Sequence, residues 1–268
     1  MEKSANQNEN PVRNSNSYFS TTIEKGLKIL NLFREDKTTL SLKDISQELG
    51  TDRTSAYRYV NTLVQLGYLW KDSKTKQLRL GPMALTLSNT IISNSDILQT
   101  IKPLLDSCLE TFKGSIDCGF LDGDVVHRVY QKAHREILIK NVPHVERALH
   151  CSALGKVILA FLPESQMLAI VDRLDFVMKT KYSITDRDKL LEELETTRKR
   201  GYAINNQEYI PGAISIAAPF ISPSTNYAFG ATSLGFTSIE HTKDEIERNY
   251  SPIVCDLAQR ISRMIPAR

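Results

Sequence analysis

The sequence predicts a two-domain α+β protein, in which a mostly helical winged helix-turn-helix domain precedes a larger domain of mixed helices and strands. The chain has 268 residues, enough for two domains that each bury a core of their own. Residues 21–82 carry eleven Lys and Arg against seven Asp and Glu, so their net charge of +4 exceeds the +3 of the whole chain. That segment also holds a helix-turn-helix pattern followed by a hairpin pattern. We expect a disordered tail at 1–20, the winged helix-turn-helix domain at 21–81, a linker helix at 82–95 and the larger domain at 96–268.

The composition excludes several classes of protein. With 24% charged and 41% hydrophobic residues, the chain is not disordered throughout. No apolar run approaches the roughly 18–20 residues that a membrane span needs, and the tail, rich in Asn and Ser, lacks the apolar segment of a secretory signal. The four cysteines are scattered without a C-x-x-C pair, which predicts reduced thiols, no disulfide framework and no zinc finger. We expect a cytoplasmic protein that needs no metal or cofactor.

Three helices are expected in the N-terminal domain. In the first, 22–33, an apolar stripe at spacings of three and four predicts an amphipathic helix. Ser41 is a candidate N-cap for a second helix that Gly50 ends, and Asp52 caps a third that Gly67 closes. A short turn containing Gly between the second and third helices is the helix-turn-helix arrangement, whose second helix enters the major groove of DNA. The residues expected to face inward are Ile23, Leu27, Leu30 and Phe33 in the first helix, Leu42, Ile45 and Leu49 in the second, and Ala56, Tyr59, Val60, Leu63 and Leu66 in the third.

A hairpin wing is expected after the third helix. Residues 68–70 and 77–80 have strand character, and 71–76 form a polar turn. Lys71, Lys74 and Lys76 at its tip suit contacts to phosphate, which position a protein without specifying sequence. Candidates for contacts to bases lie on the exposed front of the third helix, because Arg pairs with guanine and Ser or Thr with several base edges; they are Arg53, Thr54, Ser55, Tyr57 and Arg58. The alternative is that these residues only solvate one face of an ordinary three-helix domain.

The segment after Pro82 is too apolar for an exposed linker. It holds Met83, Leu85, Leu87, Ile91 and Ile92. We expect a helix that connects the two domains and packs against a second copy of the chain. Packing inside its own larger domain is the alternative.

The remaining chain alternates helices and strands, which predicts an α+β sheet covered by helices. A hairpin with an Asp122-Gly123-Asp124 turn is its clearest local feature. Helices are expected at 98–112, 153–162, 168–174, 189–201 and 242–264, and strands at 116–121, 125–131, 137–142, 214–220 and 227–234.

The sequence resembles the IclR family of bacterial regulators from about Thr21 onward. The order and spacing of several short motifs carry the resemblance: Lys25-Gly26-Leu27-Lys28-Ile29-Leu30, Leu66-Gly67-Tyr68, Leu80-Gly81, Leu149-His150-Cys151-Ser152-Ala153-Leu154-Gly155-Lys156, Arg200-Gly201-Tyr202-Ala203 and Ile216-Ala217-Ala218-Pro219. The resemblance implies a GAF-like effector-binding domain, assembly into dimers or tetramers, and control of a catabolic operon by a small organic acid. The expected DNA partner is a palindromic double-stranded operator, because two-fold dimers read two-fold sites.

The start of the helix at Ser152 is a candidate carboxylate site on physical grounds as well. The first N–H groups of a helix lack internal acceptors and carry the positive end of its dipole. Free amides of Ala153 and Leu154, with the Ser152 hydroxyl, could hold an effector carboxylate; a helix satisfied by its own cap is the alternative. In IclR-like proteins this helix start lines the effector pocket, and the resemblance extends the pocket to Asn205, Ser215, Thr232 and Leu234.

This chain departs from the family pattern at the predicted pocket. Asn205 stands where the family commonly has an acidic residue, and Ser215 replaces a frequent Cys. An Asn side chain can donate a hydrogen bond where Asp can only accept. Leu234 at a position often taken by Ser suggests a more apolar wall, and Arg147 could add a cationic clamp. The expected effector is therefore a carboxylate with some hydrophobic body.

Three rival functions agree less well with the sequence. Cys151 beside His150 could be a nucleophile with its base, but adjacent residues rarely meet that geometry, so we expect no enzyme. His144, His150 and Cys151 lack a partner at metal-ligand spacing. A purely architectural DNA binder would not need so large a second domain. The sequence leaves open the effector, the operator, the choice between repressor and activator, and the choice between dimer and tetramer.

Overall fold

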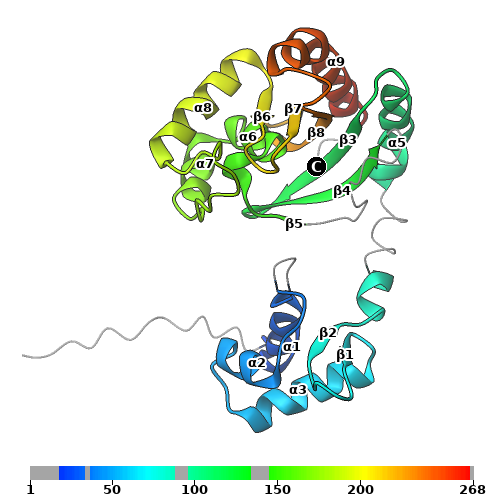
Figure 1. Ribbon diagram of the computed structural model, residues 1–268, viewed down its shortest axis with the longest axis vertical. Helices are drawn as coiled ribbons and strands as arrows, with labels where there is room; N and C mark the ends of the chain where they lie inside the picture. Colours follow the sequence, from blue (N-terminus) through cyan, green and yellow to red (C-terminus); the bar gives the residue numbers. More distant parts are fainter. Residues whose placement is uncertain (1–17, 34–36, 88–95, 134–144, 266–268) are drawn as a thin grey trace, which may run out of the picture. The chain divides into compact units, whose positions relative to one another are not determined.

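The computed structural model describes residues 18–33, 37–87, 96–133 and 145–265 (Figure 1). They belong to two compact units, within 1–91 and 92–268. Several expectations lie outside the described residues: most of the tail, the strand at 137–142, and the residues His144, Ile91 and Ile92. None of the described helices is long and apolar enough to cross a membrane.

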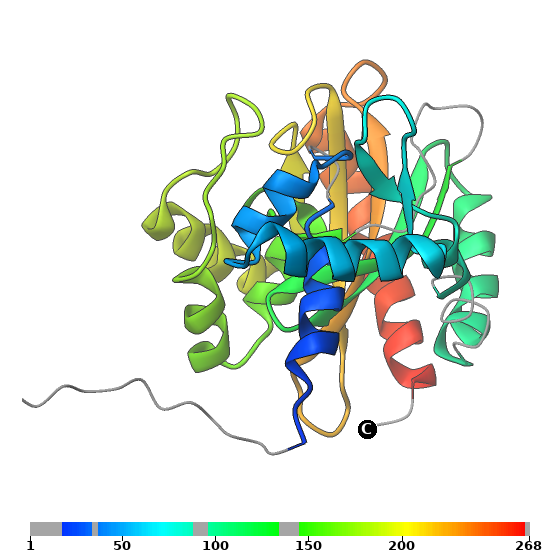
Figure 2. The ribbon, with the colours of Figure 1, turned by 90° about the horizontal axis from the view of Figure 1, so that it is seen from below.

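The N-terminal unit is a winged helix-turn-helix, as predicted. It contains α1 (Thr21–Asn31), α2 (Leu42–Glu48), α3 (Arg53–Gln65), and the antiparallel strands β1 (Leu69–Lys71) and β2 (Leu78–Leu80). Figure 2 shows α3 running across α1, with the cyan β1–β2 hairpin beyond it. The predicted caps are confirmed: Ser41 forms a capping box with Asp44, Asp52 accepts from the first turn of α3, and Gly50 and Gly67 have positive φ.

The core of this unit differs from the predicted stripe on α1. Ile29 is fully buried, whereas Ile23 and Leu27 are 64% and 57% exposed. Leu66, expected to face inward, is also exposed. It follows α3 as the C-cap, where the chain already turns toward the wing. The buried cluster is Ile29, Leu40, Ile45, Ala56, Val60, Leu69 and Leu78, with Tyr59 and Leu63 packed against it.

The C-terminal unit is a six-stranded antiparallel sheet with helices on both faces. The strand order is β5-β4-β3-β8-β7-β6. The strands are β3 (Ser115–Asp122), β4 (Val125–Ala133), β5 (Val145–Glu146), β6 (Ala203–Asn206), β7 (Ala213–Ile221) and β8 (Ala228–Thr237). The helices are α5 (Asp96–Leu109), α6 (Ala153–Ala160), α7 (Glu164–Val171), α8 (Arg187–Arg200) and α9 (Lys243–Met264), with a 3₁₀ turn η1 (Leu149–Cys151) before α6.

Each face of the sheet has its own hydrophobic core. On one face, α5 and α9 pack against residues such as Ile116, Ile216 and Leu234. On the other face, α6, α7 and α8 pack against smaller residues such as Ala217 and Ala231. Because successive strand residues point to opposite faces, the face of every sheet residue follows from its register.

The sequence patterns predicted most of these elements, but not two short strands and not the exact start of two helices. β6 was not predicted, because it is four residues long and follows directly from the Gly201 cap of α8. β5 lies where a loop was expected. α7 begins at Glu164, four residues earlier than predicted, and α8 begins at Arg187, two residues earlier than predicted, with Asp186 as its cap. These short or edge elements are held by neighbours distant in the sequence and leave little periodicity to detect.

Candidate functional site

The exposed face of α3 is the candidate surface for contact with bases. Asp52 accepts hydrogen bonds from the amides of Thr54 and Ser55 at 2.9 Å, which fixes where the helix begins. Arg53, Thr54, Tyr57 and Arg58 are all exposed, while Ala56 and Val60 are buried on the opposite side. Ser55 is half-buried. The helix therefore presents its polar side chains on the side away from the core.

The wing is tied to α3 and carries a well-defined turn. The Lys71 ammonium lies 5.6 Å from the centre of the Tyr57 ring, a distance at which a cation is attracted to an aromatic face. Asp72 accepts from the amides of Lys74 and Thr75 at 2.9 and 2.7 Å, which closes the tip. The Lys76 ammonium donates to the carbonyl of Ser73 at 2.6 Å.

Arg79 also belongs to this basic surface, although it is not among the predicted residues. Its guanidinium lies 4.3 Å from the Trp70 ring centre, and the two residues are direct partners across the hairpin. Both side chains are exposed. The alternation within the predicted strand 77–80 was a usable signal, because it assigns Arg79 and Leu78 to opposite faces.

In the C-terminal unit, the start of α6 has two amides without an acceptor among the described residues. Ser152 is the N-cap, and its hydroxyl accepts from Gly155 N at 2.9 Å. The hydrogen bonds of the described residues include none from the amides of Ala153 or Leu154. The Ser152 side chain therefore caps the helix, while the amides of Ala153 and Leu154 remain available as donors.

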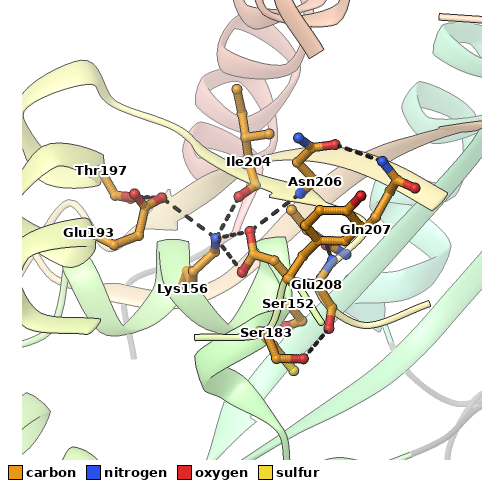
Figure 3. Close-up of polar contacts among 12 residues, drawn as sticks. Ser152, Lys156, Ser183, Glu193, Thr197, Ile204, Asn206, Gln207 and Glu208 are labelled. Atoms are coloured by element: carbon orange, nitrogen blue, oxygen red, sulfur yellow. Dashed lines mark hydrogen bonds and ion pairs between the residues drawn. The ribbon is translucent and has the colours of Figure 1, made fainter. Parts of the chain in front are cut away.

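A buried ion pair fixes α6 against the sheet. Lys156 is 1% exposed, and its ammonium donates to the carbonyl of Ile204 at 2.6 Å and to the Glu208 carboxylate at 2.7 and 2.9 Å (Figure 3). Glu193 of α8 is 3.6 Å away. Burial raises the pKa of Glu208, and Lys156 opposes that rise. The ammonium therefore joins α6, β6 and α8 at one point.

The same contacts orient Asn205. The Glu208 amide donates to Asn205 Oδ1 at 2.8 Å. Because an N–H group can only donate, the atom that faces it must be the oxygen, which leaves the Nδ2 group of Asn205 as a donor for another partner. Asn205 is the direct cross-strand partner of Ser215, so these two predicted pocket residues share the face of the sheet covered by α6.

Thr232 and Leu234 do not share that face, which corrects the prediction. Leu234 is fully buried in the core beneath α5 and α9. Thr232 pairs with Cys118 and Ala218, which belong to the same core. A shift of one residue along a strand moves a side chain to the opposite face. Ser233 and Gly235, the neighbours of these residues, lie on the α6 face instead, and Leu234 cannot be a pocket wall.

A buried charged cluster on the α6 face was also missed. Arg128 Nη2 is 2.7 Å from Glu146 Oε2, and its Nη1 is 3.5 Å from Asp117 Oδ1. Ser233 donates to Asp117 Oδ2 at 3.3 Å. Burial raises the pKa of Glu146, which is 1% exposed, and Arg128 lowers it in part. These residues come from β3, β4, β5 and β8, so only the strand register brings them together.

The other candidate residues of this region belong neither to the Lys156 ion pair nor to the Arg128 cluster. Arg147 is exposed, and His144 lies outside the described residues. His150 is buried and its Nε2 is 3.1 Å from the carbonyl of Val177; burial lowers its pKa. Burial raises the pKa of the Cys151 thiol to about 12, so at neutral pH it is not a thiolate nucleophile. Within the described ranges, no three His, Cys, Asp or Glu side chains are grouped to hold a metal ion.

Comparison with known proteins covers both units. The sequence matches the family description "Bacterial transcriptional regulator IclR C-terminal" over residues 89–263 and "IclR helix-turn-helix domain" over residues 22–73. It is 26% identical to the Pca regulon regulatory protein of Pseudomonas putida over 238 residues, which cover 88% of this chain and 81% of that protein.

Two solved structures show the same fold. An IclR family transcriptional regulator from Brucella abortus is similar with a TM-score of 0.81 and 22% identity, covering 94% of this chain and 95% of that one. An IclR homolog from Microbacterium hydrocarbonoxydans, crystallised with 4-hydroxybenzoate, has a TM-score of 0.66 and 20% identity, covering 91% and 98% of the two chains.

Proposed function

This chain belongs to the IclR family of bacterial transcriptional regulators, and from that premise we propose that its C-terminal unit senses a small organic acid and thereby controls a catabolic operon. The observation that carries the proposal is the pair of free amides at Ala153 and Leu154, together with the donor group of Asn205 on the sheet face that α6 covers. A carboxylate is the group that such donors recognise. The related homolog crystallised with 4-hydroxybenzoate supports an acid as effector.

The residues of the same region, Cys151 and His150, do not favour a catalytic function. A buried thiol with its pKa raised to about 12 and a His150 whose Nε2 faces a backbone carbonyl lack the activated pair that nucleophilic catalysis needs.

We expect Asn205→Asp to weaken effector binding at least tenfold. The carboxylate would still accept from the Glu208 amide, so the local turn survives, but a negative charge would replace the donor facing the effector. Calorimetry with the cognate acid measures the change. Asn206→Asp is the matched control, because the next residue along β6 points to the opposite face. Equal dissociation constants for the wild type and Asn205→Asp would locate the pocket elsewhere.

The N-terminal unit is proposed to contact an operator through α3 and the wing. We expect Arg58→Ala to cost about 1–3 kcal/mol on a site selected from a random DNA pool if Arg58 contacts a base. Lys74→Ala should weaken binding to all DNA sequences alike. It should also reduce the slope of the logarithm of the binding constant against the logarithm of the salt concentration by about one unit. Fluorescence anisotropy across a salt series separates the two effects. Lys189→Ala, at an exposed lysine of α8, is the control. If operator affinity is unchanged in both Arg58→Ala and Lys74→Ala, this surface is excluded as the DNA contact.

Assembly into at least a dimer is part of the proposal, because one helix-turn-helix specifies few base pairs. Residues 83–87 are helical, and Leu85 and Leu87 are 65% and 53% exposed. We expect a Leu85→Asp/Leu87→Asp variant to shift the light-scattering mass toward a monomer and to lose at least tenfold in operator affinity. Ile239→Asp, at a residue that is 94% exposed, is the control. A variant that remains dimeric would exclude this helix as the interface.

A further inference from the structure

The sheet face beneath α6 contains buried polar atoms without hydrogen-bond partners. They are Arg128 Nε, Gln131 Oε1 and Glu146 Oε1. Leaving such an atom unpaired in the interior costs free energy, and native proteins rarely gather several in one place. In native proteins such atoms are paired with ordered water or with a bound ligand.

The three atoms belong to one cluster. Arg128 and Glu146 are in direct contact at 2.7 Å. Gln131 is the cross-strand partner of Asp117, which is itself 3.5 Å from Arg128. The three side chains come from separate positions on β4 and β5, and the contacts of Arg128 with Glu146 and with Asp117 connect them.

This cluster lies on the same face of the sheet as the proposed carboxylate site. Glu146 is the cross-strand partner of Val126, and Val126 shares a hydrophobic core with Ala153 and Leu154 at the start of α6. Ser233, which donates to Asp117 of the cluster, pairs with Ala217 of the same core. The charged cluster and the start of α6 are therefore on one side of the sheet.

The unpaired atoms select the chemistry of their partner. Two of them accept hydrogen bonds and one donates. A hydroxyl group can donate to Glu146 or Gln131 and also accept from Arg128. A carboxylate cannot donate, and an ammonium cannot accept. The Arg128 charge is also already balanced by two carboxylates, so a second anion gains little there.

We infer that the effector is a hydroxy acid whose hydroxyl group, remote from its carboxylate, binds the Arg128–Gln131–Glu146 cluster. The inference rests on the proposed function, because it assigns the second end of the same ligand. A polar site for a hydroxyl group thus takes the place of the apolar pocket wall that Leu234 was expected to provide. An acid without the hydroxyl would leave these buried atoms unpaired, and such sites discriminate strongly against it.

Calorimetry on the full chain with three matched pairs of acids tests the inference. The pairs are 4-hydroxybenzoate with benzoate, gluconate with hexanoate, and threonate with butyrate. In at least one pair we expect the hydroxylated acid to bind tenfold tighter or more, since a hydrogen bond to a charged group contributes about that much.

Two variants assign the preference to the cluster. Gln131→Leu removes one acceptor and leaves the Arg128 ion pairs in place, so it should reduce the preference at least threefold without changing the affinity for the plain acid. Glu146→Gln should reduce it further, and its melting temperature checks that it folds. Gln259→Leu, an exposed residue of α9, is the control.

The outcomes separate the two proposals. Equal affinity within every pair, as expected if water satisfies the cluster, overturns the hydroxyl assignment and leaves acid sensing intact. A preference that survives both variants also overturns it. Binding of none of the six acids overturns the hydroxyl assignment together with the proposed sensing of an acid.

Discussion

Lys156→Met is expected to destabilise the C-terminal unit by about 3–5 kcal/mol, because it leaves a buried carboxylate without its counter-charge. The ammonium contacts Glu208 and the carbonyl of Ile204 at 2.6–2.9 Å and is 1% exposed. Met fills a similar volume but satisfies neither acceptor. Urea unfolding followed by far-UV circular dichroism measures the loss.

Two further variants show whether the buried charge is the cause. Lys156→Met/Glu208→Leu removes both charges and should recover a large part of the loss, since a buried ion pair is often replaceable by apolar residues. Lys199→Met breaks an exposed pair with Glu195 at 2.6 Å and should leave the stability almost unchanged, because solvent screens exposed ion pairs. If all three variants are equally stable, the ion pair contributes nothing to the fold.

The second large effect is expected at Gly155. A Cβ atom there would lie 2.5 Å from the Cα and carbonyl oxygen of Leu149, and Leu149 is fully buried. Gly155→Ala must therefore separate η1 from the first turn of α6, at a cost of about 3 kcal/mol by comparison with other overpacked sites. Because that turn holds the amides of Ala153 and Leu154, effector affinity should fall as well.

Gly26→Ala is the matched control for Gly155→Ala. Gly26 is within α1, and its Cβ would meet nothing within 4 Å. Ala is the better helix former, so this variant should stabilise its unit by about 0.5–1 kcal/mol. The single tryptophan, Trp70, lies in the wing, so its fluorescence follows the N-terminal unit alone. A Gly155→Ala protein as stable as the wild type would contradict the close packing of η1 on α6.

The local features of this protein could be predicted from the sequence. Ser41, Asp52 and Ser152 each cap a helix in the structure, because a cap depends on residues three or four positions apart. The helix-turn-helix, the wing and the central strands of the sheet were found for the same reason. Alternation and helical periodicity are properties of one short segment.

The composition of the candidate effector site was decided by the tertiary structure. Thr232 and Leu234 were assigned to a pocket that their register excludes, because one residue of shift along a strand reverses its faces. Arg128, Glu146 and Asp117 meet only because three strands are adjacent in the sheet. Lys156 and Glu208 are 52 residues apart in the sequence. No local pattern encodes such contacts, since each strand's own sequence is compatible with several neighbours, and the pairing of the whole sheet selects among them.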